Sequence, residues 1–382
     1  MAAAGEGLYL DHAATSPLRP EALDAMLPFL RDSFGNASSP HRWGRTAKAT
    51  LDAAREQVAA LIAADPEEIV FTSGGTEANN FVLRSITELH PGARVLVSAV
   101  EHPSVLRTAL HLAKRGAIQL EIIPVDTEGR AQLCWLADAL AQPTALVSVM
   151  AANNETGVLQ PIEAIAGMCQ ARGVPFHCDA TQSAWITPMD SHALGAVFVT
   201  ISAHKLGGPQ GVGALYVRRE QELAVQATGG SQERRRRAGT ENVAAIVGYG
   251  IACDCALHER DGKAQQLQTL RDQLEYSLLT ALPSLRVNGK GASRLPHILN
   301  VSLPGIEGER AVRALDAAGI AASTGAACSS GQPDPSPTLR AMGRTHAEAL
   351  EGIRFSLGWC SKPDSLPSAL ERIVSALESL RA

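Results

Sequence analysis

The chain has 382 residues, more than one hydrophobic core usually serves, so its length predicts two domains. Apolar residues make up 45% and charged residues 19%, as in an ordered globular protein, and the net charge of −5 gives no indication of nucleic-acid or anionic-membrane binding. No apolar run approaches the ~20 residues of a membrane helix, and residues 1–7 lack the pattern of a signal peptide. We therefore expect a cytoplasmic protein without nucleic-acid or membrane partners.

Short apolar runs alternate with longer segments of helical period in the first two thirds of the chain. These runs predict strands at 68–72, 93–98, 145–150, 175–178 and 196–202. Strands that are apolar throughout and separated by helix-length stretches are typical of a mostly parallel sheet covered on both faces. We expect an α/β domain whose ligands lie beyond the carboxyl ends of the strands.

The chain changes character after about residue 252. A segment of polar residues and leucines at about 253–282 predicts a long helix, and a Gly/Pro-rich loop follows at 325–337. The last predicted helix has apolar residues on one face, namely Leu370, Ile373, Val374, Leu377 and Leu380. We interpret residues 16–252 as a large domain, and residues 1–15 with 253–382 as a smaller α+β domain.

Polar motifs follow the first two predicted strands. After strand 68–72, Gly74 and Gly75 turn the chain and Thr76 begins a helix, so that backbone N–H groups and a positive helix end suit a phosphate. His102 follows the second strand. An imidazole here can stack on a flat cofactor ring and transfer protons near neutral pH, although a lone histidine is more often structural.

Asp179 lies directly after the fourth predicted strand. A carboxylate at this edge can keep a pyridinium nitrogen protonated, so that the ring withdraws electrons from a substrate; a helix cap is the alternative interpretation. Asn154 and Gln182 have amide groups that can donate hydrogen bonds to the phenolic oxygen of such a ring.

Lys205 stands in the segment Ser202-Ala-His-Lys205, where the last predicted strand ends and glycines begin. A partly desolvated amine can form a Schiff base with an aldehyde cofactor, although an exposed loop lysine is the commoner case. Because all these motifs follow strands, we expect them to meet at one edge of the sheet. A phosphate site, an acidic ring partner, a stacking imidazole and a Schiff-base lysine together predict a pyridoxal 5'-phosphate (PLP) site.

The seven cysteines are scattered and odd in number, which argues against a disulfide framework, and their spacing predicts no metal site. Cys328 has unusual surroundings, because it lies in Gly325-Ala-Ala-Cys-Ser-Ser-Gly331 just before three closely spaced prolines. We expect an exposed loop thiol that reacts as a nucleophile, in preference to a buried inert one. Four consecutive arginines at 234–237 are compatible with a solvated turn or with a docking surface for an acidic partner.

Over about residues 8–360 the sequence resembles the cysteine desulfurases, which belong to the class V aminotransferase group of PLP fold-type I enzymes. The resemblance is carried by seven segments: Tyr9-Leu-Asp-His-Ala-Ala-Thr15, Phe34-Gly-Asn-Ala-Ser-Ser39, Phe71-Thr-Ser-Gly-Gly-Thr-Glu-Ala-Asn-Asn80, Ser202-Ala-His-Lys205, Ala238-Gly-Thr-Glu-Asn242, Ser323-Thr-Gly-Ala-Ala-Cys328 and Ile353-Arg-Phe-Ser-Leu-Gly358. It implies a PLP-dependent sulfurtransferase that converts L-cysteine to L-alanine. A selenocysteine lyase, an aminotransferase of the same class and a non-catalytic protein that retains the fold are the alternatives.

The resemblance also implies roles for individual residues. Sulfur would pass as a persulfide on Cys328 to an acceptor protein, in iron–sulfur cluster assembly or another pathway. The implied catalytic residues are Cys328, Lys205 and His102. The implied cofactor contacts are Lys205, Asp179, Gln182, Asn154, Thr76, Gly75, Ser202, His204, His102 and Thr240. Arg354 and Asn154 would bind the substrate, and Thr240 would reach the phosphate of a second subunit, which implies a homodimer.

Overall fold

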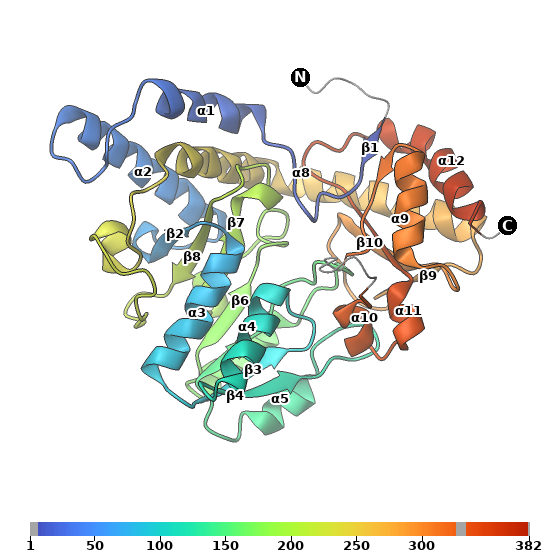
Figure 1. The fold of residues 1–382 in the computed structure, drawn as a ribbon, viewed down its shortest axis with the longest axis horizontal. Coiled ribbons are helices and arrows are strands. Elements are labelled where there is room, and N and C mark those ends of the chain that lie inside the picture. The colour runs from blue at the N-terminus through green and yellow to red at the C-terminus, as the bar shows by residue number, and fades with distance from the viewer. Residues whose placement is uncertain (1–6, 326–333, 381–382) are drawn as a thin grey trace.

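A computed structural model describes residues 7–325 and 334–380 of the chain (Figure 1). Its main feature is a seven-stranded sheet in the order β2-β8-β7-β6-β5-β3-β4. All neighbouring strands run parallel except β8, which is antiparallel to both β2 and β7. The strands are β2 (Ile69–Thr72), β3 (Arg94–Ser98), β4 (Gln119–Ile123), β5 (Leu146–Ser148), β6 (Phe176–Asp179), β7 (Phe198–Ser202) and β8 (Gly213–Val217).

All five predicted strands are present, and the prediction of a mostly parallel sheet is confirmed. Two strands were missed. β4 lies at the edge of the sheet and is largely half-buried or exposed, so its sequence lacks a continuous apolar run. β8 is fully buried, but the glycines around it resemble a loop.

Helices cover both faces of the sheet, and alternate residues of each strand face opposite cores. On β2, Val70 belongs to the core that includes residues of α3 and α4, whereas Ile69 and Phe71 belong to the core on the opposite side, which includes residues of α2 and α6. The helices of this part are α1 (Pro20–Arg31), α2 (Arg42–Leu61), α3 (Gly75–Leu89), α4 (Pro103–Lys114), α5 (Leu133–Ala139), α6 (Ile162–Ala171) and α7 (Ser191–Leu194), with short 3-10 turns η1 (Pro66–Glu68), η2 (Ala203–Lys205) and η3 (Gln232–Arg235).

The C-terminal part holds a three-stranded antiparallel sheet in the order β12-β10-β9 and a two-stranded parallel pair of β1 with β11. Leu8 of β1 pairs with Ile320 of β11, so the start of the chain lies against its last third. The elements are β1 (Leu8–Tyr9), β9 (Arg286–Val287), β10 (Ile298–Ser302), α9 (Gly308–Ala317), β11 (Ile320–Ala321), α10 (Pro337–Ala341), α11 (His346–Leu350), β12 (Gly352–Ser356) and α12 (Ser365–Glu378).

One helix, α8 (Val243–Ala281), joins the two parts. The sequence predicted a helix at about 253–282, and the structure begins it earlier, where the side chain of Asn242 accepts a hydrogen bond from Ala245 N and caps it. α8 packs on α1 and α2 in its first half and contacts β10 and α12 in the C-terminal part. Of the described helices, α8 included, none is long and apolar enough to cross a membrane.

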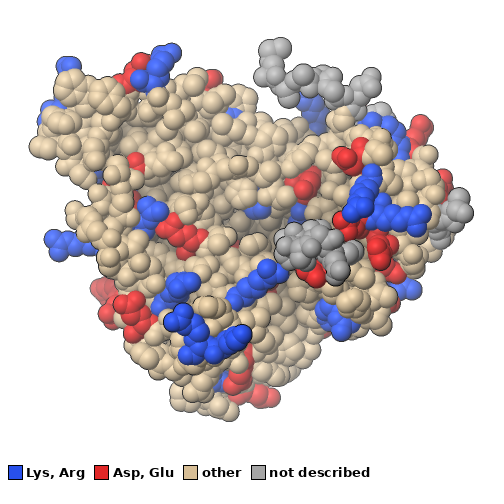
Figure 2. Space-filling view, in the orientation of Figure 1, with Lys and Arg blue, Asp and Glu red and all other residues tan. Residues whose placement is uncertain are grey.

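An apolar surface lies on and next to α1. Leu23, Leu27 and Leu30 are exposed on this helix, and Phe34 and Trp43 are exposed after it, with Phe34 81% accessible. Figure 2 shows a broad area without charged side chains below α1, with charged side chains along the upper edge of this helix. Such a contiguous exposed apolar area is typical of a surface that a partner covers.

Candidate active site

The carboxyl ends of β2, β3, β6 and β7 open onto a cavity of about 370 Å³ between the large sheet and the C-terminal part. It is lined by ten of the residues that the sequence singled out: Gly75, Thr76, His102, Asn154, Asp179, Gln182, Ser202, His204, Lys205 and Arg354. The volume lies within the usual range for cofactor sites. Thr240 is exposed and does not line the cavity of this single chain, and Cys328 lies outside the described residues.

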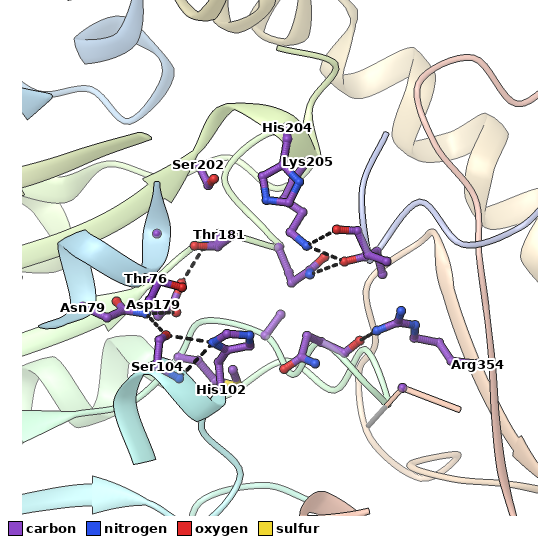
Figure 3. A pocket seen from close by; sticks show the side chains of 18 of the residues that line it. Thr76, Asn79, His102, Ser104, Asp179, Thr181, Ser202, His204, Lys205 and Arg354 are labelled. Carbon is purple, nitrogen blue, oxygen red and sulfur yellow. Dashed lines mark hydrogen bonds between the residues drawn. The ribbon is translucent and has the colours of Figure 1, made fainter. Parts of the chain in front are cut away.

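Lys205 reaches into the cavity from η2, opposite His102 (Figure 3). Its amine donates hydrogen bonds of 2.7 Å to the carbonyl oxygens of Ala13 and Ala14. Burial, followed by the positive charge of Arg354, lowers the pKa of Lys205 to about 8, against the opposing charges of Asp11 and Asp179. The amine is therefore much closer to its neutral, nucleophilic form than an ordinary lysine.

Asp179 ends β6 and is held by two donors. Asn79 Nδ2 donates to Oδ2 at 2.7 Å, and the backbone N–H of Thr181 donates to Oδ1 at 3.0 Å. These bonds fix the carboxylate at the floor of the cavity. The second bond is the local turn expected for an aspartate at the start of a loop; no helix begins here, so the alternative interpretation of Asp179 as a helix cap is wrong.

The end of the cavity near α3 can receive a phosphate. Gly75 and Thr76 form the first turn of α3, where backbone N–H groups lack helical partners. Ser202 and His204 line the same cavity. A Cβ on Gly75 would lie 3.1 Å from Thr181 Oγ1, so only glycine keeps this space open without displacing a neighbour. Burial, and secondarily Lys205, lowers the pKa of His204 to about 4, so the ring is a neutral hydrogen-bonding group.

Arg354 enters the cavity from β12 in the C-terminal part. Nη2 donates to Asp11 Oδ1 at 2.7 Å and Nη1 donates to the carbonyl oxygen of Asn154 at 2.8 Å. Arg354 Nε is buried without a partner among the described residues. The guanidinium is thus fixed in orientation and retains a free N–H, as a carboxylate-binding arginine requires.

Several residues of the site were missed by the sequence reasoning. Asn79 and Ser104 line the cavity, and only the fold brings them together, because they lie on different helices. Asn79 stands one helical turn after Thr76 inside a quoted motif, a spacing that places both on one face of α3, so this residue had a detectable signal.

Glu155 is a second kind of missed residue, fully buried beside the cavity. Its carboxylate accepts hydrogen bonds from the hydroxyls of Ser336, at 2.5 Å, and Thr338, at 2.8 Å. The same side chain lies beside Gly325, where an added Cβ would be 3.2 Å from Glu155 Cγ. One side chain of the large part therefore lies next to the chain on both sides of residues 326–333.

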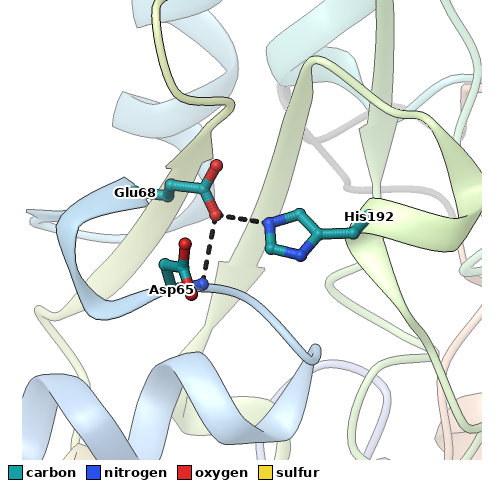
Figure 4. A group of neighbouring side chains, drawn as sticks. All are labelled: Asp65, Glu68 and His192. Atoms are coloured by element: carbon teal, nitrogen blue, oxygen red, sulfur yellow. Dashed lines mark hydrogen bonds and ion pairs between the residues drawn. The ribbon is translucent and has the colours of Figure 1, made fainter.

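Asp65, Glu68 and His192 form another cluster, shown in Figure 4, whose ligand atoms lie within 4.8 Å of one another. Glu68 accepts hydrogen bonds from the backbone N–H groups of Asp65 and Arg219 and lies 2.7 Å from His192 Nε2. Burial raises the pKa of Glu68, but these hydrogen bonds outweigh it and lower the pKa. The hydrogen bonds of Glu68 therefore give this cluster a structural role, because they connect η1 with α7 and with the end of β8.

The donor set fits PLP. Lys205 is available for its aldehyde, Asp179 for its ring nitrogen, and the first turn of α3 with Ser202 and His204 for its phosphate. Thr181 Oγ1, which faces the space beside Gly75, is buried and has no partner among the described residues, as expected for a group that bonds to a ligand. A mostly parallel sheet with these groups at its carboxyl edge defines a PLP-dependent enzyme of fold type I.

Comparison with known proteins agrees with this class. The sequence model of the family described as aminotransferase class-V matches residues 8–366. The chain is 42% identical over 377 residues to a cysteine desulfurase of Sinorhizobium fredii, covering 98% of this chain and 97% of that protein. The chain belongs to the aminotransferase class-V family and, within it, to the cysteine desulfurases.

Solved structures give the same result. A NifS-like protein superposes with a TM-score of 0.91 at 31% identity, covering 98% of this chain and 100% of that one. A structure described as SspA in complex with cysteine gives a TM-score of 0.81 at 30% identity and covers 92% of this chain and 98% of that one. The predicted family, fold class, enzyme class and cofactor are thereby confirmed.

Proposed function

We propose that this enzyme removes sulfur from L-cysteine, releases L-alanine and retains the sulfur as a persulfide on Cys328 for an acceptor protein. The observation that carries the proposal is the single cavity that places Lys205, Asp179 and His102 opposite Arg354. The names of the relatives, cysteine desulfurase among them, and the cysteine bound in a similar structure support the choice of substrate.

Each residue of the cavity has a role that suits the chemistry of its side chain. PLP supplies an electron-withdrawing ring that makes the Cα and Cβ positions of a bound amino acid reactive. Asp179 would hold the ring nitrogen, Asn154 and Gln182 its phenolic oxygen, and Gly75, Thr76, Ser202 and His204 the phosphate. Lys205 would hold the aldehyde group and then move protons at Cα of the substrate, a task that its pKa of about 8 suits. His102 would stack on the ring and take part in proton transfer.

Arg354 would bind the carboxylate of the substrate, with Asn154 beside it. Asp11 and the Asn154 carbonyl already fix the orientation of the guanidinium, so little conformational entropy is lost on binding. The Cys328 thiolate would then attack the sulfur of the substrate and use its own electron pair to form the new S–S bond. The C–S bond would break with its electron pair left on Cβ, which would take up a proton to give alanine.

The position of Gly325 supports the assignment of Cys328. Gly325 lines the cavity, and Cys328 follows it by three residues. The two residues are therefore near neighbours in the sequence, which supports the proposal.

The function is tested by incubating the pure PLP-loaded protein with L-cysteine and measuring alanine, sulfide and protein-bound persulfide. We expect alanine and sulfur in equal amounts. Pyruvate with aminated cofactor and no alanine would instead identify an aminotransferase. Turnover with L-selenocysteine but none with L-cysteine would identify a selenocysteine lyase.

The pH dependence of cofactor capture provides a first quantitative prediction. Burial lowers the pKa of Lys205 from 10.5 to about 8, so its neutral fraction, and with it the rate of PLP binding to the cofactor-free protein, should rise as the pH rises through about 8 and then level off. In Asp11→Asn, loss of a nearby negative charge should shift this midpoint to lower pH. The growth of visible absorbance over a pH series measures both midpoints; a midpoint near that of an ordinary lysine would contradict the assignment.

We further propose that the chain forms a homodimer through the apolar surface of α1, Phe34 and Trp43. Leu27→Asp with Leu30→Asp should weaken self-association by about 100-fold or more, because two charges would be buried in the interface. Light scattering after size-exclusion chromatography measures the mass. Tyr276→Asp, at the far end of α8 and 73% exposed, is the matched control and should remain dimeric. Weaker PLP binding by the monomeric variant would support a contact from Thr240 of a second copy.

We also propose a cellular location, a division into domains and a sulfur acceptor. A reducing cytoplasm agrees with the six described cysteines, all of them free thiols. Pairing of β1 with β11 supports grouping residues 1–15 with 253–382, apart from the large domain at 16–252. The acceptor is proposed to be a protein, with iron–sulfur cluster assembly as one candidate pathway.

A further inference from the structure

A chain of hydrogen bonds connects His102 with Asp179 beneath the cavity (Figure 3). Asn79 Nδ2 donates to Asp179 Oδ2 at 2.7 Å and to Ser104 Oγ at 2.8 Å. Ser104 Oγ lies 2.7 Å from His102 Nδ1. Asn79 and Ser104 are 1% and 7% exposed, so water does not compete for these bonds.

The direction of each bond follows from chemistry. The Asp179 carboxylate has no hydrogen to donate, so Asn79 must present its NH₂ group to it. The second hydrogen of that group points to Ser104 Oγ, which leaves the hydroxyl hydrogen of Ser104 free to point to His102 Nδ1. Donation therefore runs outward from Asn79 in both directions.

A second donor fixes the role of His102 Nδ1. His102 is the N-cap residue of α4, and the backbone N–H of Ser104 donates to Nδ1 at 3.2 Å. A backbone amide can only donate, so Nδ1 is an acceptor and carries no hydrogen. A neutral ring then has its hydrogen on Nε2.

The hydrogen bonds of Asn79 leave its side-chain oxygen without a partner, which indicates that they have a role in the active site. Asn79 Oδ1 is buried without a partner among the described residues, because both amide hydrogens are turned toward Ser104 and Asp179. An unpaired buried carbonyl is destabilising. Packing alone does not explain why the Asn79 amide donates two hydrogen bonds while its oxygen accepts none.

We propose that Asn79 and Ser104 are positioning residues that hold His102 as its Nε2–H tautomer and join it to Asp179. His102 thus enters the reaction as a hydrogen-bond donor at Nε2, and Lys205 is the residue left to act as the first base. The proposal rests on the proposed function only for the identity of that reaction; the tautomer itself is independent of it.

The test is nuclear magnetic resonance of the PLP-loaded protein with ¹⁵N-labelled histidine, with His102 assigned by its loss in His102→Gln. We expect Nδ1 to resonate as an unprotonated acceptor and Nε2 as a protonated nitrogen. In Ser104→Ala, Nδ1 keeps only the backbone donor and its resonance should shift. In Asn79→Ala, the Ser104 hydroxyl loses the donor that orients it and is free to turn away from Nδ1, so the Nδ1 resonance should shift, whereas the backbone N–H of Ser104 still keeps the hydrogen on Nε2.

Asn80→Ala is the matched control, because Asn80 is the next residue of α3 and its amide bonds instead to the Thr76 and Ser104 carbonyls. It should leave the His102 resonances unchanged. We also expect Ser104→Ala to lower kcat about tenfold with little change in KM, as for a lost hydrogen bond that matters in the transition state. If Asn79→Ala does not fold, Ser104→Ala alone carries the test.

Two results would overturn the proposal: a hydrogen on Nδ1 of the wild-type ring, or His102 resonances that stay the same in both variants. If the resonances are as expected but the protein forms no alanine from cysteine, the role of Asn79 and Ser104 in positioning His102 is supported and the proposed function is rejected. The two hypotheses therefore fail separately.

Discussion

Replacing Lys205 with alanine is expected to abolish the visible absorbance band of the bound cofactor and to lower alanine formation by about four orders of magnitude or more. Lys205 is the one lysine that lines the cavity in the described chain, and its amine has a pKa of about 8. Removing it eliminates the amine that we propose as both the covalent anchor for the aldehyde and the base for the substrate. Absorbance spectra and an alanine assay measure the two effects independently.

The control is Lys48→Ala, which removes an exposed lysine that is ion-paired with Asp52 on α2. It should keep both the band and the activity. An unchanged band in Lys205→Ala would show that another amine holds the cofactor and would reject the assignment of this lysine.

Replacing Cys328 with alanine is expected to keep the cofactor band and abolish the protein-bound persulfide. Lys205, Asp179 and the phosphate site are intact in this variant, so PLP binds as before. The only nucleophile assigned to the sulfur is missing, so alanine formation should fall at least about 100-fold. Mass spectrometry after a single exposure to L-cysteine detects the persulfide by its added sulfur.

Cys134→Ser provides the matched control, because Cys134 is exposed on α5 and does not line the cavity. It should form persulfide normally. Wild-type turnover in Cys328→Ala would refute the sulfur relay, while leaving the cofactor assignments unaffected.

The sequence predicted those parts of the site that depend on single strands. Asp179 and Ser202 end buried strands and Lys205 follows one, and the carboxyl ends of parallel strands must meet at one edge of the sheet. Their convergence in one cavity was therefore predictable without coordinates. Arg354, by contrast, was assigned only through the family resemblance, because nothing in the local sequence of β12 indicates that this strand reaches the cavity.

Residues that act through distant partners escaped the sequence reasoning for a physical reason. Glu155 meets Ser336 across 181 positions of the chain, and Asn79 meets Asp179 across 100. Propensity and periodicity describe neighbours within a few residues and contain no information on such pairings. The same limit applies to the acceptors of the Lys205 amine, which belong to the N-terminal segment.

That N-terminal segment has a consequence for how the protein matures on the ribosome. Its position depends on partners made last: Tyr9 pairs with Ala321, Asp11 binds Arg354, and the N–H of Ala13 donates to Ser356 Oγ. Residues 8–14 therefore gain all of these partners only after β12 has been translated, although domains generally fold in the order of their synthesis. In a nascent chain shorter than about 356 residues, the carbonyl groups of Ala13 and Ala14 lack part of the support that holds them beside the lysine amine, so we expect cofactor loading to be completed after β12 has been translated.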